Sequence, residues 1–205
     1  MSIAEEGLPF IIVPAFIGLI LVFFGARNLY LSIPGAVLLA IGGFSLFFFR
    51  DPSREIPQDE KAVVSPGDGT VMEVAGEGSG KIVRIFLSVF NVHIQRSPYR
   101  GTVTEVKYCP GKFMPAMKPR AHIENEKNVI KIKTEKGEMT VSQIAGIIAR
   151  RVVSRVKAGD NLEKGQKIGL IRFGSQVDIM LPAGADIRVK PGDKVIGGET
   201  VIAEF

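Results

Sequence analysis

The sequence is poor in the residues that build disulfides and metal sites. Its 205 residues include one cysteine, Cys109, and two histidines, His93 and His122. A single cysteine excludes an internal disulfide and fits a reducing compartment, so we interpret Cys109 as a packed thiol. A zinc site needs about three or four Cys, His or carboxylate ligands at short spacings. A membrane-tethered zinc peptidase is therefore a poor interpretation, and we predict no metal.

Charge is almost absent from the first part of the chain. Between residues 8 and 49 the one formally charged residue is Arg27, which separates two apolar stretches, Leu8–Ala26 and Leu29–Phe49. Each stretch is close to the roughly 20 residues that cross a bilayer core as a helix. A cleaved signal peptide has a basic start and one shorter apolar stretch, whereas two glutamates come first here. We therefore predict a retained anchor.

The predicted anchor is residues 1–49, and residues 50–205 form a second domain. Arg27 and Asn28 leave room only for a tight connection, so we expect a helical hairpin that spans the membrane or inserts into one leaflet. Either arrangement returns the chain to its starting side. Basic residues after the second stretch favour the cytoplasmic face of the cell membrane for the second domain. The alternative is a buried helical hairpin in the core of a soluble protein.

Basic residues outnumber acidic ones in the second domain. Residues 50–205 hold 25 of the 26 Lys and Arg and 19 of the 21 Asp and Glu, a net charge of +6. This sign suits an anionic lipid surface. It would also suit nucleic acid, but the sequence contains no basic-aromatic array or recognition-helix pattern. We predict a membrane partner and no nucleic acid.

Short β-branched runs, broken by Gly, Pro and Asp, are typical of strands in the second domain. The runs are Lys81–Val89, Gly101–Tyr108, Asn128–Thr134 and Met139–Ile144. Residues Ile144–Arg151 fit either a short helical turn or a continued strand. The second domain is therefore predicted to be mainly β.

A repeat with an offset of 33 residues lies near the C-terminus, where Val156–Asp160 followed by Gly165 matches Val189–Asp193 followed by Gly198. Gly-Asp pairs and isolated glycines mark turns between strands. We predict two similar hairpins in one sandwich or flattened barrel, an arrangement that resembles lipoyl and biotinyl carrier domains. A carrier module on a membrane anchor is thus an alternative, but it needs a lysine between the copies, and Arg172–Met180 contains none.

Four short motifs occur in order along the chain: Phe48–Arg54, Ser65–Val71, Phe86–Pro98 and Phe173–Asp178. In this order and spacing they resemble the phosphatidylserine decarboxylase family, including its short single-domain members. The resemblance covers nearly the whole chain, and four ordered motifs are specific although each alone would be weak. It implies a carboxy-lyase that converts phosphatidylserine, or archaetidylserine, to the ethanolamine phospholipid.

The resemblance also implies that the chain makes its own prosthetic group by cutting itself between Gly174 and Ser175. The Ser175 hydroxyl would attack the Gly174 carbonyl, and elimination from the ester would leave a pyruvoyl group on residue 175. The products would be a beta chain, 1–174, and an alpha chain, 175–205, which form a heterodimer. Because the pyruvoyl ketone can accept the electrons released with carbon dioxide, no added cofactor is expected.

Asp68 and His93 match the Asp-His-Ser triad that carries self-processing in this family. The histidine would act as the base, oriented by the carboxylate. Two plainer interpretations stay open. His93 could be a strand histidine satisfied by a backbone carbonyl, and Asp68 could be a turn residue, since Pro66–Gly69 is typical of a turn.

Some bacterial members have a second histidine three residues before the triad histidine, where this chain has Phe90. The group that protonates the decarboxylated substrate is therefore open, with His122 as an outside candidate. Arg50, Arg54 and Arg96 are candidates to bind the lipid phosphate. A pyruvoyl enzyme for a free amino acid is a further alternative, but a soluble substrate gives no reason for a membrane anchor.

Overall fold

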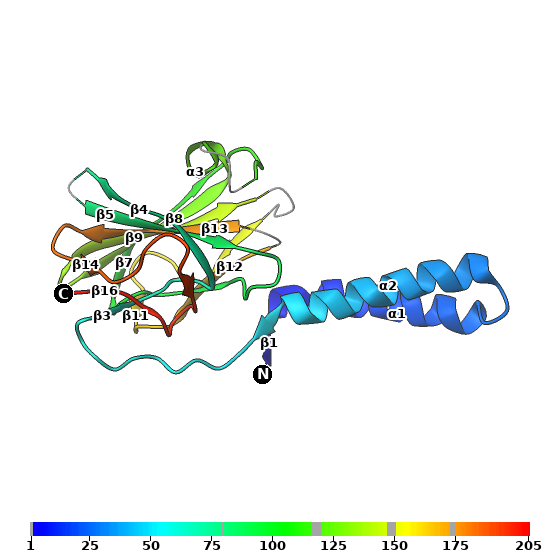
Figure 1. The fold of residues 1–205 in the computed structure, drawn as a ribbon. Coiled ribbons are helices and arrows are strands. Elements are labelled where there is room, and N and C mark those ends of the chain that lie inside the picture. Colours follow the sequence, from blue (N-terminus) through cyan, green and yellow to red (C-terminus); the bar gives the residue numbers. More distant parts are fainter. Residues whose placement is uncertain (1, 79, 116–119, 147–150, 173–174) are drawn as a thin grey trace. The chain divides into compact units, whose positions relative to one another are not determined.

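The computed structural model describes residues 2–78, 80–115, 120–146, 151–172 and 175–205. The chain divides into two compact units, Met1–Ser53 and Arg54–Phe205. Figure 1 shows that the first unit is dominated by helices and the second by strands.

Two packed helices make up most of the first unit. Its elements are β1 (Ser2–Ile3), a 3-10 turn (Glu5–Gly7), α1 (Leu8–Phe24), α2 (Leu29–Phe48) and β2 (Arg50–Asp51). Asn28 caps α2 by accepting a hydrogen bond from the Tyr30 amide at 3.0 Å, which satisfies one of the unpaired donors at a helix start. The helices approach closely at small residues, since a Cβ added to Gly18 would lie 2.8 Å from the Gly35 carbonyl oxygen.

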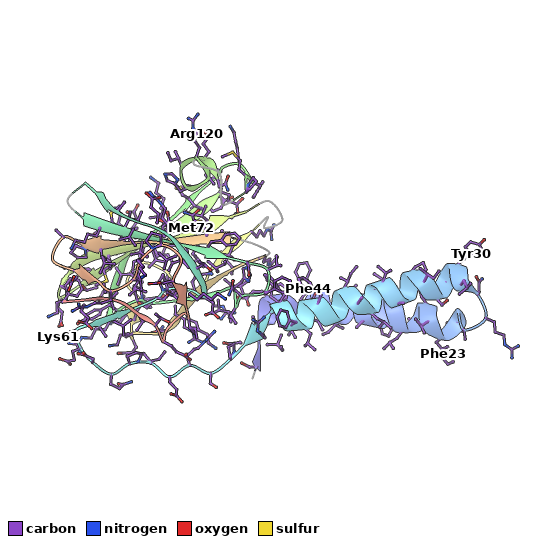
Figure 2. The ribbon with its side chains drawn as sticks, in the orientation of Figure 1. Phe23, Tyr30, Phe44, Lys61, Met72 and Arg120 are labelled. Carbon is purple, nitrogen blue, oxygen red and sulfur yellow. The ribbon has the colours of Figure 1, made fainter. Side chains whose placement is uncertain are left out.

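The surface of this helical pair is apolar. In the most hydrophobic 18-residue window of each helical segment, only 11% of the window is buried for Glu5–Phe24 and only 22% for Leu29–Phe48. Figure 2 shows Phe23 and Tyr30 projecting outward near the loop that joins the helices, and they are 75% and 92% exposed. A buried core hairpin does not have such a surface, and exposed apolar area of this size marks an interaction with a membrane or a partner. Two long apolar helices therefore suggest membrane association.

An antiparallel sheet of eight strands forms the centre of the second unit (Figure 1). In spatial order its strands are β11 (Asn161–Leu162), β7 (Gly101–Cys109), β8 (Lys127–Thr134), β9 (Gly137–Ala145), β13 (Ser175–Pro182), β5 (Gly80–Leu87), β4 (Gly69–Glu77) and β15 (Lys194–Val195). The four runs predicted as strands are β5, β7, β8 and β9, so the mainly β prediction is confirmed. The undecided segment continues β9 as far as Ala145, and residues 147–150 lie outside the described part of the chain.

Two three-stranded sheets complete the second unit. One has the order β14 (Asp186–Ile187), β16 (Val201–Glu204), β3 (Ala62–Val64), and the other has the order β10 (Val152–Ser154), β12 (Lys167–Ile171), β6 (Ile94–Arg96). A short helix, α3 (Ala121–Glu124), follows β7 in the chain. Buried aliphatic side chains from the large sheet and from both small sheets pack in one hydrophobic core, which is the sandwich-like arrangement that was predicted.

The strands of the C-terminal repeat pair differently from the predicted hairpins. The first strand of each copy, β11 or β15, joins one end of the large sheet. The second strand, β12 or β16, is the middle strand of a small sheet. Each copy is thus a corner between two sheets, because its second strand pairs with the strand just before the copy, β10 or β14, on one side and with a distant strand, β6 or β3, on the other.

The repeat also extends to earlier segments of the chain. Ser65–Val71 (SPGDGTV) and Ser97–Val103 (SPYRGTV) share five of seven residues and precede or begin β4 and β7. The amide of Gly198 donates to the carbonyl of the first serine in one copy, and that of Gly165 does so in the other, both at 2.8 Å. The second unit is therefore built from two related halves.

Ile56 packs against both halves. Gly165 and Gly198 have φ of +79° and +82°, a region that side chains rarely adopt. A Cβ added to either glycine would contact the side chain of Ile56. The linker 54–61 therefore runs along the two equivalent turns of the β unit.

Candidate active site

Ser175 begins a central strand of the large sheet. Its backbone lies opposite Leu87 of β5 on one side and Ala145 of β9 on the other. Gly174, the other half of the predicted cleavage site, lies outside the described residues, as does the side chain of Ser175. The pairing of β13 with β5 continues to Pro182. A chain break before residue 175 would therefore leave β13 held on both sides.

His93 is buried directly before β6, with 1% of its surface exposed. Its ring Nδ1 lies 3.0 Å from the carbonyl oxygen of Asn91. Because a carbonyl can only accept, Nδ1 carries the hydrogen in this contact, and the neutral ring has its lone pair on Nε2. The backbone carbonyl expected for a structural histidine is thus present, and it also orients the ring so that Nε2 is the nitrogen that can accept a proton.

The carboxylate of Asp68 lies in the turn before β4. Its Oδ1 accepts from the Gly197 amide at 2.8 Å and from Arg54 Nη2 at 3.0 Å, and its Oδ2 accepts from the same Nη2 at 2.9 Å. His93 is not among these contacts. The predicted hydrogen bond between Asp68 and His93 therefore stays a prediction.

The related half of the fold helps to separate a turn role for Asp68 from a chemical one. Arg100 occupies the matching position of the second copy, and its side chain is 46% exposed and pairs with Glu60 and Glu135. The side chain of Asp68 is 14% exposed. Since the same turn forms with an arginine, turn geometry does not require aspartate at residue 68, and its burial calls for another explanation.

Three segments that carry the predicted residues lie side by side. The amide of Arg96 in β6 donates to the carbonyl of Pro66 at 2.9 Å, which joins the His93 segment to the Asp68 turn. Gly67 of the Asp68 turn lies against Val177 of β13, since a Cβ added to Gly67 would be 3.1 Å from Cγ1 of Val177. The Ile171 amide, shortly before Ser175, donates to the His93 carbonyl at 3.1 Å. The fold therefore brings the three predicted segments together.

A row of buried amide side chains holds the main chain at His93. Gln95 Nε2 donates to the His93 carbonyl at 2.9 Å, and Gln143 Nε2 donates to Gln95 Oε1 at 2.8 Å. Asn128 Nδ2 in turn donates to Gln143 Oε1 at 3.0 Å. The sequence prediction gave these residues no role. Amide side chains within apolar strand runs were the available signal, because a buried amide needs a hydrogen-bond partner.

The remaining candidates occupy separate places. Phe90 is 68% exposed, and His122 lies in α3, in a pocket whose lining includes Arg84 and Asp178. Among the phosphate candidates, Arg54 and Arg96 are not solvated surface charges. Arg96 is 8% exposed and its Nη1 donates to the Gly165 carbonyl at 3.0 Å, while Arg54 binds Asp68.

Arg50, the third phosphate candidate, belongs to the first unit. Its Nη1 donates to the Phe47 carbonyl at 2.8 Å, and its guanidinium lies 4.0 Å from the centre of the Phe47 ring. Arg50 is therefore tied to the end of α2.

Comparisons with known proteins agree with the motif order. A family model described as phosphatidylserine decarboxylase matches residues 41–203. The phosphatidylserine decarboxylase proenzyme of Geotalea uraniireducens (strain Rf4) is 44% identical over 98% of this chain and 95% of its own length. The proenzymes of that name from Symbiobacterium thermophilum and Burkholderia multivorans are 44% and 43% identical, each over 99% of this chain and 95% and 96% of their own lengths.

Proposed function

The chain belongs to the phosphatidylserine decarboxylase family, whose members are proenzymes of a pyruvoyl-dependent carboxy-lyase, and from this premise we propose how its own residues carry the reaction. Gly174-Ser175 is the cleavage site, and Asp68 and His93 serve it. The observation that carries the proposal is the convergence of the Asp68 turn, the His93 segment and β13.

The first stage is self-cleavage of the proenzyme. The Ser175 hydroxyl loses its proton to His93 Nε2, and its oxygen forms a bond to the Gly174 carbonyl carbon while the peptide C–N bond breaks, which gives an ester and a free amine. Elimination then removes the Cα proton of residue 175 and breaks its Cβ–O bond, leaving a carboxylate at Gly174 and a Cα=Cβ double bond, dehydroalanine, at residue 175. Addition of water and loss of ammonia complete the pyruvoyl group.

The residues proposed to assist Ser175 have separate roles in self-cleavage. The Asn91 carbonyl holds Nδ1–H, so the neutral ring presents its lone pair on Nε2 for the serine proton. Asp68 supplies a fixed negative charge from the neighbouring turn, which stabilises the imidazolium that forms. The amides of Gln95 and Gln143 fix the main chain that carries the ring.

The described residues fit a pyruvoyl group at position 175. The strand that would carry it is paired with β5 and β9 from its first residue, so fragment 175–205 stays in the sheet after the cut, and the beta and alpha chains form the proposed heterodimer. When present, the pyruvoyl carbonyl supplies an electron sink for loss of carbon dioxide from a substrate amine. The substrate is the headgroup of an anionic serine phospholipid, and the product is the ethanolamine phospholipid.

The anchor sets where the reaction occurs. We place residues 1–49 in the membrane and the catalytic domain, residues 50–205, on the cytoplasmic side of the cell membrane. Support comes from the exposed apolar surface of α1 and α2 and from the basic residues that follow them. The +6 charge of the catalytic domain would attract it to anionic lipid.

Chemical trapping tests the site of lipid chemistry directly. Mature protein is mixed with phosphatidylserine vesicles and sodium cyanoborohydride, and phosphatidylcholine vesicles serve as the control. We expect phosphatidylserine alone to become attached to fragment 175–205, at residue 175, as read by tandem mass spectrometry. Attachment to a lysine, or to fragment 1–174, would refute the assignment of residue 175 as the reactive carbonyl.

Removing residues 1–49 tests the role of the anchor. We expect activity on vesicle phosphatidylserine to fall about tenfold or more, because the enzyme no longer has a raised effective concentration at the bilayer. Self-cleavage should continue, since Asp68, His93 and Ser175 all lie in the unit Arg54–Phe205. A soluble short-chain phosphatidylserine is the control, and it should be turned over equally by both proteins. A truncated chain that folds but stays uncut would contradict this division of roles.

A further inference from the structure

Arg54 lies in the linker that leads into the β unit, and its side chain is only 9% exposed. One nitrogen, Nη2, contacts both oxygens of Asp68, at 3.0 Å and 2.9 Å. The other terminal nitrogen, Nη1, lies 3.9 Å from Glu199 Oε1. The main contact of the Arg54 side chain is therefore with Asp68, a residue of the proposed processing site.

The hydrogen bonds at Asp68 fix the rotation of its carboxylate. Each carboxylate oxygen can accept about two hydrogen bonds. Among the described residues, Oδ1 has two donors, Arg54 and the Gly197 amide, whereas Oδ2 has Arg54 alone. One acceptor position therefore remains on Oδ2, and Arg54 together with Gly197 decides which way it points.

The backbone of the linker is itself held in place. Ile56 packs against Gly165 and Gly198 in the two equivalent turns, and the Glu55 amide donates to Glu199 Oε1 at 3.3 Å. Both contacts are made by the two residues that directly follow Arg54, and they limit the reach of its side chain. Arg54 is therefore presented to Asp68 from a fixed main chain.

The charge of Asp68 also needs a partner. A carboxylate at 14% exposure loses much of its hydration, and a buried charge is tolerated when it is paired and hydrogen-bonded. The matching position of the other half holds the more exposed Arg100. In the described part of the chain, the linker arginine Arg54 therefore pairs with the half of the fold that contains the predicted triad aspartate.

We propose that Arg54 is a positioning residue for self-cleavage. It pairs with the charge of Asp68 and holds its carboxylate in one rotation, so that the open acceptor position of Oδ2 faces the imidazolium formed at His93. The proposal rests on the processing role of Asp68 given above. It extends the machinery of self-cleavage to the linker, outside the three predicted triad segments.

A double-mutant cycle in the full-length chain tests the proposal. Arg54→Gln, Asp68→Asn and the double variant are expressed, and conversion of precursor to fragments 1–174 and 175–205 is followed by pulse-chase. We expect Arg54→Gln to slow cleavage about tenfold and the double variant to be no slower than Asp68→Asn, because residues that act through one contact are not additive. Arg54→Lys should keep part of the rate, since a single nitrogen makes both contacts with Asp68.

Two controls separate positioning from folding. Arg100→Gln removes an arginine with two carboxylate partners from the matching turn and should leave the rate unchanged. The thermal unfolding midpoint of each variant is measured in an uncut Ser175→Ala background. Positioning predicts that the rate of Arg54→Gln falls while its folded fraction at the assay temperature stays that of the parent.

Each outcome of the cycle has a separate meaning. Cleavage of Arg54→Gln at the parent rate, beside a slow Asp68→Asn, would overturn the inference alone. Rate losses that multiply in the double variant would do the same, because Arg54 would then act independently of Asp68. If Asp68→Asn were instead cleaved at the parent rate, Asp68 would have no role in processing.

Discussion

We expect the Ser175→Ala variant to remain one uncut chain that has no decarboxylase activity. Alanine has no hydroxyl to attack the Gly174 carbonyl, so neither the ester nor the pyruvoyl group can form. The loss should be complete because decarboxylation needs the pyruvoyl group, which is produced by self-cleavage. Denaturing gels of the variant should show the intact chain, whereas the parent protein should give fragments 1–174 and 175–205. The shorter fragment should resist Edman sequencing, because a ketone would replace its amine.

A neighbouring serine provides the matched control for that result. Ser142 of β9 pairs with Asp178 of β13, so Ser142→Ala removes a strand hydroxyl from the same part of the sheet. We expect Ser142→Ala to cut itself and to decarboxylate like the parent. If the parent chain stayed intact while active, or if Ser175→Ala were cut at the same place, the assignment of the cleavage site would be wrong.

Replacing His93 by alanine should slow self-cleavage by about a hundredfold to ten-thousandfold, the usual contribution of a general base. Purified His93→Ala would then be mostly precursor. His93→Gln should be almost as slow, although a glutamine can still donate to the Asn91 carbonyl, because an amide does not accept a proton at neutral pH. The rate is measured by the appearance of fragment 175–205 after synthesis is stopped.

The pH dependence of cleavage gives a second reading of the same role. Histidine is the side chain whose charge ordinarily changes between about pH 5 and 8. Since the base must be neutral, the cleavage rate of the parent should fall as the pH is lowered through this range. His122→Ala should leave both the rate and the pH profile unchanged. Normal processing of His93→Ala would place the base elsewhere while leaving the family assignment intact.

The second half of the fold shows a signal that the sequence prediction overlooked. The matching segments SPGDGTV and SPYRGTV are visible in the printed sequence, and they would have extended the C-terminal repeat to two related halves. With both halves aligned, the aspartate of one turn stands against the arginine of the other. That contrast favours a chemical role for Asp68 without any coordinates.

The sequence by itself determined the apolar helices, the strand-forming runs and the ordered motifs. Each of these depends on residues that are close in the chain: two apolar stretches of 20 residues each make the helix pair, and alternating or β-branched runs make strands. For that reason β5, β7, β8 and β9 agree with the predicted runs within a few residues. The motifs likewise identified Asp68, His93 and Ser175 as one candidate set.

Only the tertiary structure decided what these residues contact. It places Arg54 and Gly197 on the Asp68 carboxylate and the Asn91 carbonyl on the His93 ring, and it separates the strands of each repeat into different sheets. Such contacts join segments as far apart as residues 68 and 197, and many sheet partners satisfy the same alternating pattern. Strand pairing is settled by which arrangement buries the common core and leaves the fewest backbone groups unpaired, and that is a property of the whole fold.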